Sequence, residues 1–537
     1  MLKNRTGRVK SQGEGAVGTR FYFDLSSCAR WGGNVVGIIR VERELARFAK
    51  RNLGSEVSFC VYDKPRQRFL HVPDAIAEEI FSGRTSFSFD SPPAAPSFAQ
   101  PAPLSRLIRG MVAFLPQEFS YQLLQRPKTY IALQRLRGRR LRRDDVTQIR
   151  EERERSIHEG SAWAVTRRDL RRRLLSHPWV YRSLQRVQGR RLTKDQVLRE
   201  RDELGRAPAP ARALRYASDT FVEEIALNSK SAVISCGLDW DHKDMRTIYN
   251  LKKRDGFRYL AVVYDLIPVT YPHFVVPGYD SLLRDYIGEL VWLADKCFCI
   301  SETTRQDLMN YAAENGLQDL DAVAFPLGND LPKAKSDADV TSPTVELPRR
   351  LANKRFALFV STIEPRKNHR VLYEAWDRCV REGRVDPREH CLVFVGRQGW
   401  GSDDLVREIG ANPATKSSIM LLNHVTDEML GELYRQCAFG LFPSHYEGYG
   451  LPLAELLLAG KASFASNAGA LSEIGGDLVV RLDPKDTLAW ADCLSRAMTD
   501  VAYVGELAAR VKSDFRPTIW KDAAQEFFAK VGESATP

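Results

Sequence analysis

Short apolar runs and amphipathic stretches alternate along most of the chain. The runs at 231–237, 296–301 and 355–361 are largely apolar and carry no helical stripe, which is typical of strands buried in a parallel sheet. The stretch 36–50 places apolar residues three to four positions apart, as a helix with one buried face does. This alternation predicts an α/β protein built from doubly wound sheets.

The beginning of the chain follows this pattern. Residues 1–19 are polar and glycine-rich, which is typical of a disordered terminus. A strand at 20–25 is followed by Gly32 and Gly33 and then by the helix at 36–50, an order that opens many doubly wound domains. A second strand at 57–62 is expected to start a hairpin. Further strands are expected at 231–237, 259–269, 296–301, 355–361 and 439–442.

The pattern divides the chain into five segments. After the N-terminus, a first Rossmann-like domain is interrupted by a Ser/Pro/Ala-rich linker and an arginine-rich module, and a second such domain follows a linker that ends near Leu347. The expected bounds are 1–19, 20–84 with 216–335, 85–215 for the insertion, 348–514 for the second domain, and 515–537 for a C-terminal helix.

Composition narrows the class of protein. Hydrophobic residues make up 44% of the 537 residues and charged residues 27%, as in globular proteins. The nine cysteines form no C-x-x-C pair, which favours buried thiols in a reducing compartment over disulfides or a zinc site. The first residues lack the apolar core of a signal peptide, and no apolar run is long enough for a membrane-spanning helix. These features predict a cytoplasmic protein.

The positive charge is concentrated in one segment. The chain has a net charge of +11, but residues 121–215 alone carry 26 Lys/Arg and 11 Asp/Glu, a net of +15, so the remainder carries −4. Within that segment, 123–146 and 174–197 repeat one another at an offset of 51. A duplicated basic helical module is compatible with a solvated hairpin, with peripheral binding to an anionic membrane, or with a partner or acceptor. No nucleic-acid motif accompanies it.

One stretch combines groups that suit a sugar nucleotide. After the strand at 439–442, the sequence gives a glycine-bearing loop with Glu447 and then a helix with Glu455 that ends near Gly460. A loop that enters a helix N-terminus in this way favours an anion, commonly a phosphate. Two carboxylates beside a phosphate site are unfavourable unless they face hydroxyl groups or a metal ion. A sugar supplies such hydroxyl groups.

The sequence FPSHYEGYGLPLAE, with seven residues between Glu447 and Glu455, resembles the signature of the retaining glycosyltransferases of family 4. These are GT-B enzymes, in which two Rossmann-like domains face a cleft, and they use nucleotide-diphosphate sugars. The resemblance is strong over 355–531 and moderate over 20–62 and 231–330. It implies that 325–330 is the last strand of the first domain and that the C-terminal helix crosses back to that domain.

The resemblance also implies roles for individual residues. Arg366 and Lys367 would bind the donor diphosphate, Glu447 the donor sugar, and Glu455 the ribose. Asp265 and His273 follow a strand of the first domain, in a stretch where Tyr264 replaces the family's common His. The expected catalytic residues are Glu447, Arg366, Lys367, Asp265 and His273. The expected donor-binding residues are Gly33, Ser361, His424, Val425, Ser444, Gly448, Tyr449, Gly450, Leu451 and Glu455.

These expectations describe a retaining transferase that needs no cofactor and no metal ion. The donor would be a nucleotide sugar, with GDP-mannose or a related deoxysugar favoured by resemblance. The acceptor would be a glycan or lipid-linked glycan in surface polysaccharide or lipopolysaccharide synthesis, and the enzyme would be peripheral on the inner face of the plasma membrane. Two alternatives stay open at this point: a phosphorylase-like GT-B enzyme that acts on sugar phosphates, and a scaffold that binds membrane or glycan.

Overall fold

The computed structural model describes most of the chain outside the basic segment. The described residues are 19–32, 37–83, 85–89, 213–317, 319–331, 347–351 and 353–534. The disordered terminus and the duplicated module that the sequence predicts therefore lie outside the described residues. Among the described helices, none combines the length and apolarity that crossing a membrane requires.

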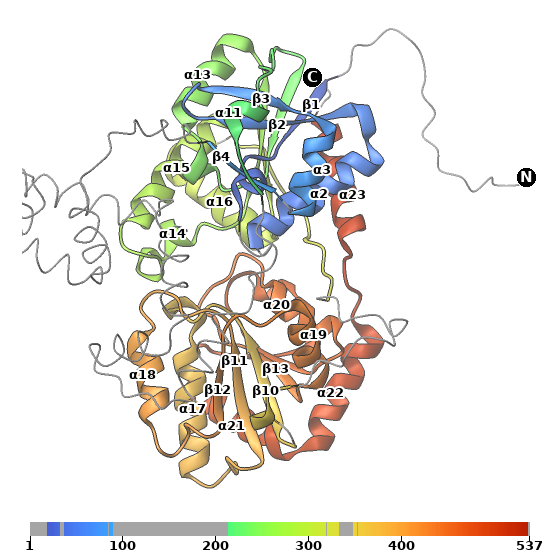
Figure 1. Ribbon diagram of the computed structural model, residues 1–537. Helices are drawn as coiled ribbons and strands as arrows, with labels where there is room; N and C mark the ends of the chain where they lie inside the picture. The colour runs from blue at the N-terminus through green and yellow to red at the C-terminus, as the bar shows by residue number, and fades with distance from the viewer. Residues whose placement is uncertain are drawn as a thin grey trace, which may run out of the picture. The chain divides into compact units, whose positions relative to one another are not determined.

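The first Rossmann-like half is built on a seven-stranded sheet in the order β3-β2-β1-β6-β7-β8-β9 (Figure 1). Neighbouring strands are parallel except β2 and β3, which form the expected hairpin. The order changes direction between β1 and β6, the point at which doubly wound folds place their ligand crevice. The strands are β1 (Arg20–Asp24), β2 (Val57–Asp63), β3 (Arg68–Val72), β6 (Ser231–Ser235), β7 (Arg258–Val263), β8 (Lys296–Cys299) and β9 (Ala322–Ala324).

Helices connect these strands on both faces of the sheet, as parallel neighbours require. The longest are α2 (Gly37–Asn52), α15 (Tyr279–Leu293) and α16 (Glu302–Glu314). The others are α1 (Ser26–Arg30), α3 (Asp74–Ser82), α11 (Ala217–Thr220), α12 (Asp239–His242), α13 (Met245–Asp255) and α14 (Ile267–Thr270), with 3-10 turns η1 (Gly54–Glu56) and η2 (Pro272–Phe274).

The second half has a six-stranded parallel sheet in the order β12-β11-β10-β13-β14-β15. Its strands are β10 (Arg355–Val360), β11 (His390–Val395), β12 (Ile419–Leu422), β13 (Phe439–Phe442), β14 (Ser463–Ser466) and β15 (Val479–Leu482). Its helices are α17 (His369–Arg381), α18 (Asp403–Ala411), α19 (Asp427–Gln436), α20 (Leu451–Leu458), α21 (Thr487–Thr499) and α22 (Val501–Asp514). The 3-10 turns are η3 (Arg349–Leu351), η4 (Pro365–Lys367), η5 (Gly469–Glu473) and η6 (Gly476–Leu478). Two doubly wound halves confirm the predicted α/β class.

The last helix, α23 (Trp520–Glu533), packs against the core of the first half. Phe527 contacts Phe298 and Phe325, with ring centroids 4.9 and 5.0 Å apart. Gly328 lets the chain pass this helix, because a Cβ at that position would lie 2.4 Å from the Trp520 Cα. The chain therefore ends on the domain in which it began, as the resemblance implies.

Two short strands flank the long stretch that the structure leaves undescribed. β4 (Thr85–Ser88) pairs in parallel with β5 (Ala213–Tyr216), from Thr85 opposite Ala213 to Ser88 opposite Tyr216. The chain thus leaves and re-enters the first half at adjacent positions, which is the geometry of an insertion. The sequence predicts an irregular linker from 85 onward, but residues 85–88 are a strand because their side chains alternate in burial.

Two further expectations about strands are wrong. The strand expected at 259–269 ends at Val263, and Ile267–Thr270 is helical. An apolar run does not distinguish a buried strand from a buried helix, whereas Pro268 in the first turn is a helix signal. Residues 325–330 are not a strand; the edge strand is Ala322–Ala324. Phe325 and Leu327 are apolar because they are buried in the core beside α23.

Candidate functional site

The loop after β13 has the geometry that its sequence predicts. Gly450 has a φ of 119° and precedes the first residue of α20, a conformation that a residue with a Cβ adopts only with strain. Pro452 occupies the first turn of α20, where its missing N–H costs nothing. The loop therefore delivers Glu447 and the N-terminus of α20 to the carboxyl edge of the second sheet.

Glu447 is held by two cations that follow β10. Lys367 Nζ donates to Glu447 Oε1 at 2.5 Å, and Arg366 Nη1 donates to Glu447 Oε2 at 2.8 Å. Arg366 also donates to Glu364 Oε1 at 3.1 Å and to the Tyr446 carbonyl at 2.8 Å. Glu447 is only 6% exposed. One carboxylate thus pairs with both cations at once.

The charges of this cluster shift one another's ionisation. Burial by itself raises the pKa of Glu447, but Arg366 and Lys367 outweigh it and lower the pKa to about 2, with help from the buried Ser444 hydroxyl. Burial would lower the pKa of Arg366, but Glu447 and Glu364 raise it overall. Burial and the neighbouring Arg366 lower the pKa of Lys367, and Glu447 opposes that fall. Glu447 and Arg366 are therefore ionised at neutral pH.

The ion pairs of Glu447 with Arg366 and Lys367 make the free energy of unfolding depend on pH. A carboxylate whose pKa falls from 4.5 to about 2 on folding contributes stability that is present above pH 4.5 and lost as the pH falls through 2. The whole contribution is about 3 kcal/mol. Urea unfolding between pH 2 and 5 should show a steeper loss of stability for the wild type than for Glu447→Gln. If the free energy of unfolding fell equally steeply with pH in the wild type and in Glu447→Gln, the ion pairs of Glu447 would not be formed.

The first half adds Asp265 to the cluster. Asp265 lies after β7, where its Oδ1 accepts from the Ile267 N–H at 3.1 Å. Burial raises its pKa, and the nearby Arg366 opposes that rise. Asp265 therefore lies beside Gly448, where the charges of Arg366, Lys367 and Glu447 act on it.

Gly448 lies close to the first half in the loop 443–450, which we call the donor loop because the sequence analysis expects donor-binding residues in it. Its carbonyl accepts from Ser301 Oγ at 2.8 Å and Thr304 Oγ1 at 3.3 Å. A Cβ at this position would lie 2.3 Å from the Tyr264 carbonyl oxygen and 2.8 Å from the Asp265 Cβ. The need for close backbone approach therefore explains the glycine here.

Gly448→Ala should lower the free energy of unfolding by about 1–3 kcal/mol, because backbone on both sides must move. The matched control is Gly505→Ala, since Gly505 lies inside α22 with no atom within 4 Å of a Cβ and alanine is favoured in helices. Urea unfolding measures both variants. A Gly448→Ala protein as stable as the wild type would contradict the close approach.

Glu455, in the second turn of α20, is held from two directions. Tyr434 on α19 donates its hydroxyl to Oε2 at 2.7 Å, and Arg40 on α2 donates from Nη1 to Oε1 at 3.0 Å. Burial raises the pKa of Glu455, and both partners oppose that rise. The sequence gives no signal for Arg40, because the pair joins residues 415 positions apart.

Further contacts missed by the sequence analysis fasten α16 to the second half. Glu473 accepts from the backbone N–H groups of Glu302 and Thr303 at 2.9 and 2.7 Å, so it caps the helix from outside its own chain segment. Tyr446 donates its hydroxyl to Asp307 at 2.5 Å. These contacts fasten Tyr446, in the loop after β13, and Glu473, at the end of η5, to α16.

The remaining predicted residues are placed in different ways. Ser361 follows β10, and His424, with a φ of 58°, and Val425 follow β12 at the carboxyl edge of the second sheet. His273 is exposed; its ring lies 4.2 Å from that of Phe274, which stacks on His445 at 5.1 Å. Gly33 lies outside the described residues.

Tyr449 and Leu451 turn toward the first half. Tyr449 donates its hydroxyl to the Leu327 carbonyl at 3.1 Å, and Leu451 packs against the core of the first half. Tyr264, at the position of the family's His, is also buried, and its hydroxyl donates to the Cys236 carbonyl at 2.5 Å.

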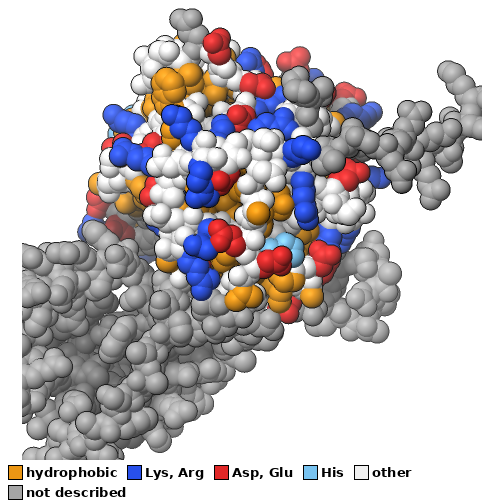
Figure 2. Space-filling model, turned by 90° about the horizontal axis from the view of Figure 1, so that it is seen from above, with side chains coloured by type: hydrophobic (Ala, Val, Ile, Leu, Met, Phe, Trp, Pro, Cys, Tyr) orange, Lys and Arg blue, Asp and Glu red, His pale blue; other side chains and the backbone are white. Residues whose placement is uncertain are grey.

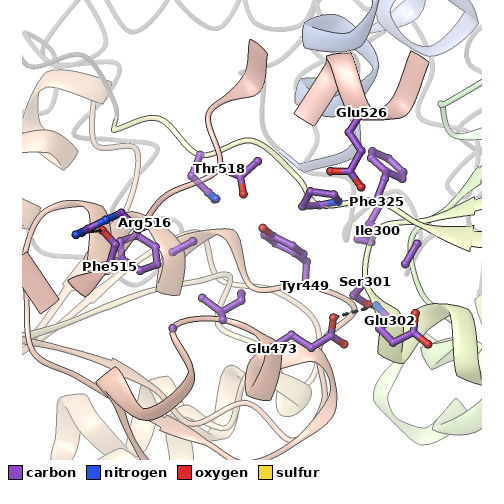
Figure 3. A pocket seen from close by; sticks show the side chains of 16 residues that line it. Ile300, Ser301, Glu302, Phe325, Tyr449, Glu473, Phe515, Arg516, Thr518 and Glu526 are labelled. Atoms are coloured by element: carbon purple, nitrogen blue, oxygen red, sulfur yellow. Dashed lines mark hydrogen bonds between the residues drawn. The ribbon is translucent and has the colours of Figure 1, made fainter. Parts of the chain in front are cut away.

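A cavity of about 390 Å³ lies beside the donor loop (Figure 3). Tyr449 and Ala454 line it together with residues of the crossing segment such as Phe515 and Thr518. Figure 3 shows Tyr449 among these residues and the hydrogen bond between Glu473 and the backbone of α16. Neither the cations of the cluster nor its acids line this cavity, whereas Tyr449, one of the expected donor-binding residues, does.

The charges outside the cluster are mixed. Figure 2 shows Lys and Arg side chains interspersed with Asp and Glu on the face that it presents. Within the described ranges, no group of three or more His, Cys, Asp or Glu side chains is arranged to hold a metal ion.

Comparison with known proteins finds similarities to the second half of the chain. Residues 354–500 match the family described as Glycosyl transferases group 1. The serotype-specific mannosyltransferase WbdA of Escherichia coli is 30% identical over 36% of the chain and 24% of its own length. The O-antigen chain mannosyltransferase B of the same organism is 30% identical over 33% of the chain and 45% of its own length. The matches thus span less than half of either relative.

A search of solved structures finds HepE of Anabaena in complex with UDP and glucose, at 16% identity and a TM-score of 0.45. The match covers 56% of this chain and 78% of that one.

Proposed function

Because residues 354–500 belong to the glycosyl transferases group 1 family, we propose that the protein is a retaining glycosyltransferase. It transfers a sugar from a nucleotide-diphosphate sugar to a hydroxyl group of a glycan or lipid-linked glycan in surface polysaccharide synthesis. A mannose-like sugar is favoured, because relatives of this domain are named as mannosyltransferases. The observation that carries the proposal is the buried cluster of Arg366, Lys367 and Glu447.

The cluster supplies what cleavage of a sugar–diphosphate bond needs. Negative charge develops on the leaving diphosphate, and fixed cations in a water-poor site stabilise such charge with little reorganisation. Arg366 and Lys367 are fixed by Glu447 at 2.8 and 2.5 Å. The backbone N–H groups at the start of α20 add a positive helix end.

Glu447 changes partners in this proposal. When a diphosphate takes the two cations, Glu447 is released from them and faces the hydroxyl groups of the donor sugar. Glu455 faces the ribose hydroxyl groups of the nucleotide, with Tyr434 and Arg40 behind it. The acceptor hydroxyl attacks the sugar from the face on which the diphosphate leaves, and the leaving phosphate accepts its proton. This front-face mechanism therefore needs no side-chain base.

A screen of donors tests the proposal. The purified protein is incubated separately with nucleotide sugars, GDP-mannose among them, and with the corresponding sugar 1-phosphates. Release of nucleoside diphosphate from a nucleotide sugar is expected. Release of phosphate from a sugar 1-phosphate alone would favour the phosphorylase-like alternative, and release from neither would favour a binding scaffold.

A further inference from the structure

Arg40 is a cation of the first half that pairs with an acid of the second. It lies in the first turn of α2, and its side chain is 20% exposed. Nη1 donates to Glu455 Oε1 at 3.0 Å, and Nη2 donates to the Asp330 carbonyl at 3.2 Å. The guanidinium lies 5.7 Å from the centre of the Trp520 ring. The contacts of Arg40 therefore come from α20, from the linker after β9 and from the start of α23.

These contacts orient the Glu455 carboxylate, whose burial would be unfavourable without them. Glu455 is 7% exposed, and a buried carboxylate without partners takes up a proton or turns toward water. Tyr434 and Arg40 bind one oxygen each, at 2.7 and 3.0 Å. Each carboxylate oxygen can accept a second hydrogen bond, so Glu455 retains acceptor capacity for two further hydroxyl groups.

We propose that Arg40 is a positioning residue of the donor site, which orients the Glu455 carboxylate so that it accepts hydrogen bonds from the ribose hydroxyl groups of the nucleotide. The inference rests on the proposed function and deepens it. It makes ribose recognition by the second half depend on a side chain of the first half. A purely structural ion pair between the halves would stabilise the protein without distinguishing one nucleotide from another.

The test compares ribonucleotides with their 2′-deoxy counterparts. Calorimetry measures binding of GDP, 2′-deoxy-GDP, UDP and 2′-deoxy-UDP to the full chain. The variants are Arg40→Ala, Arg40→Lys and Arg51→Ala, the last removing an exposed cation from the same helix. Circular dichroism melts establish that each variant is folded, and Arg40→Lys supplies a milder change should Arg40→Ala unfold.

The wild type and Arg51→Ala are expected to bind at least one ribonucleotide about tenfold or more tightly than its deoxy form, the effect of one hydrogen bond to a charged group. In Arg40→Ala this ratio should fall to about twofold, and Arg40→Lys should restore part of it. An unchanged ratio in folded Arg40→Ala, or no preference for ribose in the wild type, would overturn the inference while nucleotide binding still supports the proposed function. If the wild type binds none of the four nucleotides, both are overturned.

Discussion

Glu447→Gln is expected to lower kcat by about 10²–10³-fold, the size of effect seen when one preorganised polar group of an active site is lost. Glutamine keeps the shape of the side chain but not its charge. It therefore loses the ion pairs with Arg366 and Lys367, at 2.8 and 2.5 Å, and it accepts hydrogen bonds from a sugar more weakly. Steady-state turnover of the donor found in the screen measures the effect.

The control for this variant is Glu408→Gln, the same change at an exposed pair with Arg370 on the surface of the second half. It should leave turnover unchanged, because surface ion pairs contribute little. A folded Glu447→Gln enzyme that turns over at nearly the normal rate would remove Glu447 from the mechanism.

Arg366→Ala should have the second-largest effect, and it should act on nucleotide binding as well as on turnover. The guanidinium matches a phosphate with two parallel donors, and hydrogen bonds to charged groups contribute about 1.5–3 kcal/mol each. The affinity for GDP or UDP should therefore fall by about tenfold or more. Arg366→Lys should be intermediate, since lysine retains the charge but not the planar pair of donors.

Calorimetry with the bare nucleotides measures this loss, and Arg370→Ala is the matched control. Arg370 lies on the neighbouring helix α17 and is 46% exposed, where it pairs with Glu374 and Glu408. If Arg366→Ala and Arg370→Ala bind nucleotide equally well, then Arg366 is not a phosphate ligand.

The elements that carry Arg366, Lys367 and Glu447 could be predicted from the sequence, because each of these residues lies in a short segment with its own strand, turn and helix signals. Arg366 and Lys367 are adjacent in one turn after a strand, and the loop and helix after β13 carry both acids within nine residues. Strand, turn and helix signals fix such short segments, since they depend on residues close in sequence. The helix caps Ser301 and Thr426 are equally local, because each accepts from an N–H group three positions later, of Thr304 and Met429.

The contacts between the halves could not be predicted in this way. Arg40 and Glu455 are 415 positions apart, and Glu473 caps a helix that begins 171 positions earlier. Such pairs depend on how segments distant in the sequence pack together, and neither residue type nor spacing predicts them. The contact of Tyr449 is of the same kind, because its hydroxyl binds the carbonyl of Leu327, 122 positions away.

The most direct test of the central claim is the stereochemistry of transfer at this site. Proton NMR can follow an α-linked nucleotide sugar, such as GDP-mannose, as the wild type, Arg366→Ala and Glu447→Gln consume it. The account predicts that the wild type releases nucleoside diphosphate and an initial product with the α configuration, and that both variants are slowed strongly. An initial β product, or wild-type rates in both variants, would contradict it.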